Sequence, residues 1–221
     1  MTPVAILNKL CIIQDMSKNN DRPVRLRKRL LGSPAGLRAL ASGTRQEIVD
    51  VLTSSGPIAV AELGRLLGRR PDALYYHLNV LTRAGLVVRR AAEGDGGRAA
   101  AVFAMPAAIH LDYRSGSRRE LARVVRHALR LAQREFEHEC LADRPVGSKR
   151  RRRLWGGRAM GWVTPQELER VNTLLCELHE VLRSGRPEPG RQAMAFGFLL
   201  APAGCGDRRR ATKRTGKDRL K

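Results

Sequence analysis

Acidic and aromatic residues are both scarce in this sequence. Only 21 aspartates and glutamates oppose 42 lysines and arginines, which gives the 221-residue chain a formal net charge of +21. A field of this sign attracts polyanions and repels basic partners. Aromatic residues make up 4% of the chain, too few for a large β-sandwich, whose strands draw on them. The composition therefore predicts a mainly helical protein with a polyanionic partner.

Cysteines and long apolar runs are also few. The four cysteines have no repeated spacing, so they indicate no disulfide framework. No apolar run approaches the roughly 18 residues that a membrane span needs. The apolar stretch near the start contains Lys9 and lacks a small-residue cleavage site, which argues against a secretory signal. We therefore expect a protein of the reducing cytoplasm with no membrane partner.

Residues 44–68 show the patterns of two short helices. Thr44 and Glu47 have the spacing of a capping box, which predicts the start of a first helix. A second helix is expected at about 61–67, with Gly68 placed to close it. The residues expected to face inward are Ile48, Val51, Leu52, Leu63, Leu66 and Leu67.

A third helix and a hairpin follow. Pro71 suits the first helical position, and Gly85 ends the helix. Leu74, Leu78 and Leu81 form its inward stripe. Two β-prone runs, 86–90 and 99–105, enclose a glycine-rich loop, which is a hairpin signal. Three short helices followed by a hairpin describe a winged helix-turn-helix, so the predicted fold class is mainly α with a small β-hairpin wing.

The sequence PDALYYHL at residues 71–78, followed by AGLV at 84–87, resembles the ArsR-type winged helix-turn-helix regulators of bacteria. It is closest to the branch whose recognition helix reads P-x-A-L-Y-Y-H-L. Residues 37–51 resemble the opening of that family, with Ser42-Gly43 in place of the usual proline. The resemblance covers residues 37–105, and 164–184 more loosely. It implies that the third helix enters the major groove and that the wing contacts phosphate or the minor groove.

The outward side chains of the third helix are candidates for DNA contacts. Tyrosine and asparagine can hydrogen-bond base edges or phosphates, and alanine can meet a thymine methyl group. Arginines at the start of the helix are expected near phosphate. The candidates are Arg69, Arg70, Asp72, Ala73, Tyr75, Tyr76 and Asn79. Packing of Tyr76 against the wing, and a solvated surface role for the two arginines, remain alternatives.

Three arginines flank the glycine-rich tip of the wing: Arg89, Arg90 and Arg98. An arginine suits a narrow minor groove, and Arg98 is the best candidate because it lies nearest the tip on the second strand. A charged hairpin without a DNA contact is the alternative.

A metal site is not predicted. Many members of the ArsR family bind metal through a Cys-x-Cys pair near the second helix, but this chain has no cysteine between Cys11 and Cys140. A set drawn from His138, Cys140, Cys176 and His179 is conceivable because thiolate and imidazole are zinc ligands. Cys140, however, ends an apolar stripe and is more simply explained as a core residue.

Two long amphipathic helices are expected after the wing, at 117–140 and 164–182. Thr164 and Glu167 form a capping box with proline at the first helical position. The apolar positions of both helices predict a dimer interface, and an intrachain helical hairpin is the alternative. The interface candidates are Leu121, Val125, Phe136, Leu168, Val171, Leu175, Leu178 and Leu182.

The charge lies mostly outside the winged segment. Residues 36–110 hold nine basic and six acidic side chains, whereas 1–35 hold seven and two, and 205–221 hold eight and two. Both ends have too little apolar surface to offset the entropy of ordering. We therefore predict a flexible basic N-terminal extension (1–35), a winged helix-turn-helix DNA-binding domain (36–110), a helical dimerisation region (111–185) with a basic linker (144–163), and a flexible basic C-terminal tail (186–221).

These features predict a homodimeric transcriptional regulator that binds double-stranded DNA, and the resemblance implies that it is a repressor. A twofold dimer would read an inverted-repeat operator. A sequence-nonspecific nucleoid protein acting through its basic tails, and a winged-helix protein-interaction module, are the alternatives. No nucleophile elbow, Walker loop or dinucleotide fingerprint is present, so neither enzyme activity nor a cofactor is expected. The sequence identifies no small-molecule or metal effector.

Overall fold

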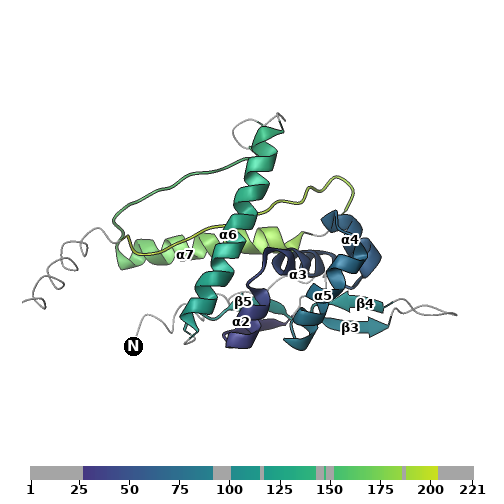
Figure 1. Ribbon diagram of the computed structural model, residues 1–221. Coiled ribbons are helices and arrows are strands. Elements are labelled where there is room, and N and C mark those ends of the chain that lie inside the picture. Colours follow the sequence, from purple (N-terminus) through teal and green to yellow (C-terminus); the bar gives the residue numbers. More distant parts are fainter. Residues whose placement is uncertain are drawn as a thin grey trace, which may run out of the picture.

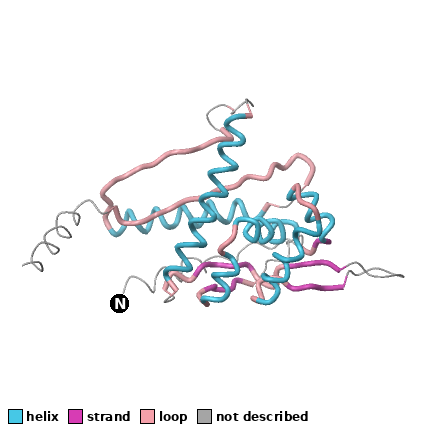
Figure 2. Tube along the Cα trace, viewed as in Figure 1, coloured by secondary structure: helices cyan, strands magenta, loops and turns pink. Residues whose placement is uncertain are grey.

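The computed structural model describes residues 27–91, 101–114, 117–142, 147, 152–185 and 188–203. Short helices and two small sheets form a body at one end, and two longer helices, which run in different directions, pack against it (Figures 1 and 2). This arrangement confirms the predicted fold class, mainly helical with a small β-hairpin wing. Among the described residues, no helix is both long and apolar enough to cross a membrane.

Four short helices build the helix-turn-helix body: α2 (Pro34–Leu40), α3 (Gly43–Ser55), α4 (Val60–Leu67) and α5 (Pro71–Arg83). Ser33 caps α2 by accepting a hydrogen bond from the Gly36 amide. Gly68 ends α4 in the left-handed conformation, with φ of 61°, where glycine has no Cβ penalty. Pro71 stands in the first turn of α5, as expected.

The wing is a three-stranded antiparallel sheet with the order β2-β4-β3. Strands β3 (Val88–Ala91) and β4 (Ala101–Ala104) form the predicted hairpin. Strand β2 (Ile58–Ala59) was not expected from the sequence; its Ile58 pairs with Phe103 of β4. The added strand lies between α3 and α4, so it ties the wing to the helical body.

A second sheet corrects one of the predicted boundaries. Strand β1 (Lys28–Leu31) pairs in parallel with β5 (Ala108–Leu111), and Leu31 is buried in the core. Residues 28–35 therefore belong to the folded body, whereas the prediction placed them in a flexible extension. The reason is that β1 pairs with a strand some 80 residues later, so the local sequence carries no sign of its partner. Residues 1–26, which are most of the predicted N-terminal extension, and 204–221, which are half of the predicted C-terminal tail, lie outside the described residues.

The core of the body consists mainly of leucines. Leu37, Ile48, Leu52, Leu63, Leu74, Leu78 and Leu81 are completely buried. Of the predicted inward residues, Leu66 is exposed and this prediction was wrong. The buried face of α4 is formed by Val60, Leu63 and Gly64, and Leu66 lies about 110° around the helix axis from the middle of that face.

The two longer helices differ in how they join the body. Helix α6 (Arg118–Leu141) packs on α2 and α3, and its Leu121 and Val124 belong to the core cluster. Helix α7 (Pro165–Ser184) lies beside α3 but has no buried residue. Its predicted capping box is present, with Thr164 and Glu167 bonded in both directions.

The capping box predicted at Thr44 and Glu47 is absent. Helix α3 begins at Gly43, and its N-cap, Ser42, makes no side-chain cap hydrogen bond. The Glu47 carboxylate accepts hydrogen bonds from Arg69 and Arg134 instead. Two cations compete successfully with the weaker backbone amide donor for this carboxylate.

Candidate nucleic-acid interface

Helix α5 presents a continuous stripe of polar side chains to solvent. Asp72, Tyr76, Asn79 and Arg83 are all exposed and follow spacings of three and four, so they share the face opposite the buried leucines. The Tyr76 side chain is 68% exposed. Arg83 was not among the predicted site residues, although its spacing from Asn79 was a signal for it. We call these four residues the outer stripe.

Three further predicted residues flank or precede the outer stripe. Ala73 and Tyr75 are exposed on its two sides. The Arg70 side chain is 87% exposed and lies 3.6 Å from the Asp72 carboxylate. This weak surface pair leaves the Arg70 guanidinium accessible to a phosphate at the start of α5.

Arg69 differs from its neighbour Arg70. Its side chain is 36% exposed, and its Nη2 donates to Glu47 Oε2 at 2.8 Å. Its backbone amide donates to the Gly64 carbonyl at 2.8 Å. A Cβ atom on Gly64 would lie 2.6 Å from the Arg69 carbonyl oxygen, so the turn between α4 and α5 requires glycine at position 64. Arg69 and Arg70, which the sequence analysis assigned the same role, therefore have different surroundings in the structure.

His77 lies beside the outer stripe, on the α5 side facing two arginines. Burial, followed by the charges of Arg45 and Arg69, lowers the pKa of its imidazole. The Tyr76 ring meets the His77 ring edge-on, with 5.3 Å between centroids. His77 is therefore neutral near pH 7 and supports Tyr76, which remains exposed on the outer face of α5.

The wing projects from the body beside α5 (Figure 1). Arg89 and Arg90 of β3 are both exposed. Because side chains alternate along a strand, they point to opposite faces of the hairpin. Arg98, the preferred candidate for a minor-groove contact, lies outside the described residues.

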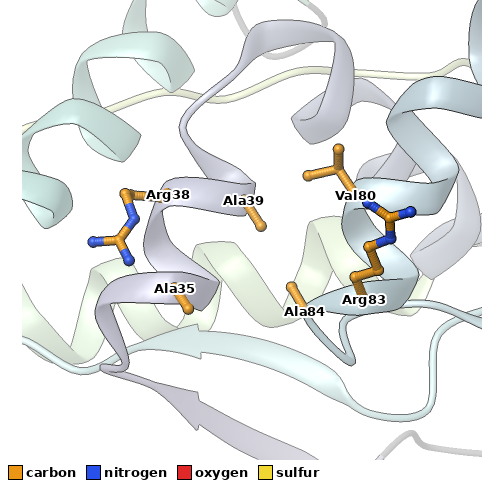
Figure 3. A pocket seen from close by; sticks show the side chains of 6 residues that line it. All are labelled: Ala35, Arg38, Ala39, Val80, Arg83 and Ala84. Atoms are coloured by element: carbon orange, nitrogen blue, oxygen red, sulfur yellow. The ribbon is translucent and has the colours of Figure 1, made fainter.

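A shallow depression of about 330 Å³ lies between α2 and the end of α5. Its floor is made by alanine and valine side chains, and Arg38 and Arg83 lie at its opposite ends (Figure 3). Arg38 lies 3.8 Å from Glu120 of α6. The two guanidinium groups do not point toward one position, so the depression is not an anion-binding site.

The predicted dimer residues fall into two groups. Leu121 is buried in the core of its own chain, so its assignment to a dimer surface was wrong: α6 needs this residue to pack on the body. Val125 is half-buried, and Phe136 lies against Gly156 of the same chain. On α7, Val171, Leu175 and Leu182 are half-buried, while Leu168 and Leu178 are exposed.

An exposed apolar stripe on α7 lies beside the predicted seam and shares Leu178 with it. Leu174, Leu178 and Val181 are 47%, 38% and 70% exposed. Their spacing of four and three places them on one face. We call these three residues the α7 stripe.

The cysteines and histidines of α6 and α7 do not gather into a site. Cys140 is exposed, so its interpretation as a core residue was wrong. It stands near the end of α6, beyond the part of that helix that packs on the body. Cys176 is exposed as well. Within the described ranges, no group of three or more histidine, cysteine, aspartate or glutamate side chains has a geometry suited to a metal ion.

Comparison with known families agrees with this geometry. Residues 40–90 match the family model described as a helix-turn-helix domain. The matched segment runs from the end of α2 through α5 into β3, so it contains the whole outer stripe. No curated protein matches the sequence significantly. The match supports a helix-turn-helix regulator that binds DNA.

Proposed function

We propose that this protein is a dimeric, ArsR-like bacterial repressor that acts in the cytoplasm by occupying an inverted-repeat operator. The observation that carries the proposal is the outer stripe of α5. A helix with its leucines completely buried and its polar face fully open is suited to enter the major groove. The wing stands beside that helix, where it can contact the adjacent backbone.

The outer stripe offers chemistry for reading bases. Asn79 can pair with adenine through two hydrogen bonds, and Asp72 can accept from the amino group of cytosine. Asp72 is otherwise unfavourable near phosphates, so its exposed position at the start of α5 favours a contact with a base. Arg70, Arg83, Arg89 and Arg90 are exposed cations that can hold the phosphates on either side.

The α7 stripe supports the dimer. Three exposed apolar side chains on one face of a helix form a surface that water solvates poorly. Pairing with a second copy would cover this face and relate the two α5 helices by a twofold axis. The half-sites would then lie about 34 Å apart or a multiple of that distance.

Selection of bound fragments from genomic DNA, followed by competition binding, tests the proposal. We expect one inverted-repeat site to be preferred over random DNA by at least about 10³-fold. Asn79→Ala is expected to lower that preference by about 10- to 100-fold and to leave nonspecific affinity unchanged. Gln133→Ala, an exposed amide on α6, is the matched control and should change neither quantity.

The same measurements identify the two competing functions. Equal affinity for all fragments would show a nonspecific nucleic-acid binder, the function that the net charge of +21 favours. An affinity independent of salt would indicate a protein-interaction module, because neutralising phosphates gives a steep negative salt dependence.

A further inference from the structure

Three consecutive polar residues at the start of α3 connect this helix to the rest of the body. Arg45 donates to backbone carbonyls at the end of α2. Gln46 is buried, and its Nε2 donates to the Leu40 carbonyl at 3.1 Å and to the Val124 carbonyl of α6 at 2.9 Å. The third residue, Glu47, uses its two oxygens for two different arginines. Together they make the first turn of α3 a junction between the DNA-reading helices and α6.

Glu47 lies at the centre of this junction. Its side chain is 15% exposed, with Oε2 2.8 Å from Arg69 Nη2 and Oε1 2.5 Å from Arg134 Nη2. Arg69 precedes α5 by two residues, and Arg134 belongs to α6. A single carboxylate therefore links the start of the recognition helix to the long helix behind it.

Arg69 is held at both its backbone and its side chain. The backbone closes the tight turn against Gly64, and the guanidinium is bound to Glu47. The Arg69 Nε is buried and has no hydrogen-bond partner among the described residues, whereas its Nη2 is held by Glu47. A guanidinium held in this way cannot reach a phosphate without breaking an ion pair of low solvent exposure.

We propose that Glu47 is a positioning residue for DNA recognition, acting through Arg69. By holding Arg69 against α3, it fixes the turn that aims α5 and keeps the Arg69 charge away from DNA. Arg134 joins α6 to the same carboxylate, so the orientation of α5 depends on how α6 is seated. This inference rests on the proposed function, and it reassigns Arg69 from a phosphate contact to a structural support of the outer stripe.

The salt dependence of DNA binding distinguishes a contact from a support. Each phosphate contact contributes about one to the slope of log affinity against log salt. We expect Arg70→Ala to lower the slope by about one, and Arg69→Ala to leave it unchanged. Arg69→Ala should instead lower the preference for the specific site by about tenfold, because α5 is no longer held at one angle. The two neighbouring arginines are matched controls for each other.

A double-mutant cycle tests the role of Glu47. Glu47→Gln should lower the site preference by about as much as Arg69→Ala, and the double variant should be no worse than either single one. Arg69→Lys, which keeps the charge, should retain more of the preference for the specific site than Arg69→Ala does. Arg134→Ala should have a smaller effect, because its side chain is 61% exposed. Circular dichroism on each variant checks that the fold is retained.

Several outcomes would overturn the inference. A slope lowered by about one in Arg69→Ala would make Arg69 a phosphate contact. Additive losses in the double variant would show that Glu47 and Arg69 act separately. The slope of log affinity against log salt is measured on random DNA as well. The inference is therefore tested even if the wild type prefers no site and the proposed repressor function fails. If the chain binds no DNA at all, the unfolding constants of the same four variants are measured by urea denaturation. A coupling between Glu47 and Arg69 of less than about twofold in the unfolding constant would then refute the proposed interaction.

Discussion

Helices α5 and α7 have similar sequence patterns but differ in how far the rest of the chain buries them. Each has proline in its first turn and leucines at spacings of three and four. The α5 leucines are completely buried, whereas α7 has no buried residue at all. The periodicity of a helix therefore identifies its apolar face, but it does not identify what covers that face.

The cause of the difference is the number of elements that surround each helix. Helix α5 packs against α2, α3 and α4, all of which lie close to it in sequence. Helix α7 follows a long connecting segment and lies against α3 along part of its length. The apolar face of α5 is thus covered within the chain, while the α7 stripe remains exposed.

Leu78→Ala and Leu178→Ala apply the same substitution to the two regions. Leu78 is 0% exposed and Leu178 is 38% exposed. Leu78→Ala should lower the free energy of unfolding by about 2–5 kcal/mol, because it leaves a cavity in the core. Leu178→Ala should lower the stability of the isolated chain by less than about 1 kcal/mol. Urea denaturation at low protein concentration measures both values, and equal losses would contradict the contrast drawn between the two helices.

The α7 stripe is tested by introducing charge. If the proposed dimer forms through this stripe, Leu174→Glu combined with Val181→Glu should raise its dissociation constant by at least about 30-fold, because a carboxylate buried without a partner is costly. Sedimentation equilibrium measures the change. Leu66→Glu is the matched control: Leu66 is also an exposed apolar residue, but it lies on α4 in the body. Dimers that tolerate the α7 variant, or that are lost with Leu66→Glu, would place the interface elsewhere.

The winged body could be predicted from the sequence largely because its signals are local. Pro71, the leucine stripe of α5 and Gly85 predicted the third helix correctly. Two β-prone runs around a glycine-rich loop predicted the hairpin. The missed elements depend on distant partners: β1 pairs with β5, and β2 pairs with β4. No local pattern marks a strand of two to four residues whose partner lies far along the chain.

The candidate site was predictable to a similar degree and for the same reason. Helical periodicity placed Asp72, Tyr76 and Asn79 outward, as the structure has them. Arg69 and Glu47 were assigned roles from their sequence neighbours, as a phosphate contact and a capping residue. Their contact spans 22 positions. It occupies the Glu47 carboxylate in place of the predicted cap, and we propose that it also replaces the phosphate contact predicted for Arg69.

Two threonines with capping-box spacing provide a smaller test of the same comparison. Thr164 caps α7, whereas Thr44 caps nothing. Thr164→Ala should destabilise the start of α7 by about 1 kcal/mol, and Thr44→Ala should have almost no effect on α3. Hydrogen exchange of the first-turn amides resolves each helix separately. Faster exchange in α3 with Thr44→Ala would restore the capping role that the sequence suggested.

The smallest effect concerns pH at the contact between the body and α7. Arg183 of α7 has its Nη1 3.3 Å from His110 Nε2 of β5. Burial, and then the charge of Arg183, lowers the pKa of His110 to about 4. Burial, together with the charge of Glu135, raises the pKa of Asp50 on α3 to about 6, and Arg183 opposes this rise. Burial is the main cause of both shifts and moves the two pKa values in opposite directions, whereas Arg183 lowers both.

The two shifts have opposite consequences for stability. Between pH 6.5 and 4 the unfolded chain binds more protons at His110, so this residue makes stability fall as pH falls. Between pH 6 and 3.8 the folded chain binds more protons at Asp50, so this residue makes stability rise as pH falls. His110→Gln should therefore reduce the stability lost between pH 7 and 5, and Asp50→Asn should stabilise the protein at pH 7 but not at pH 4. Both groups retain contact with solvent, so each change should be below about 1 kcal/mol. Urea unfolding at each pH measures the difference in stability between pH 7 and pH 5. If His110→Gln and Asp50→Asn changed this difference in the same direction, the pKa shifts assigned to the two groups would be wrong.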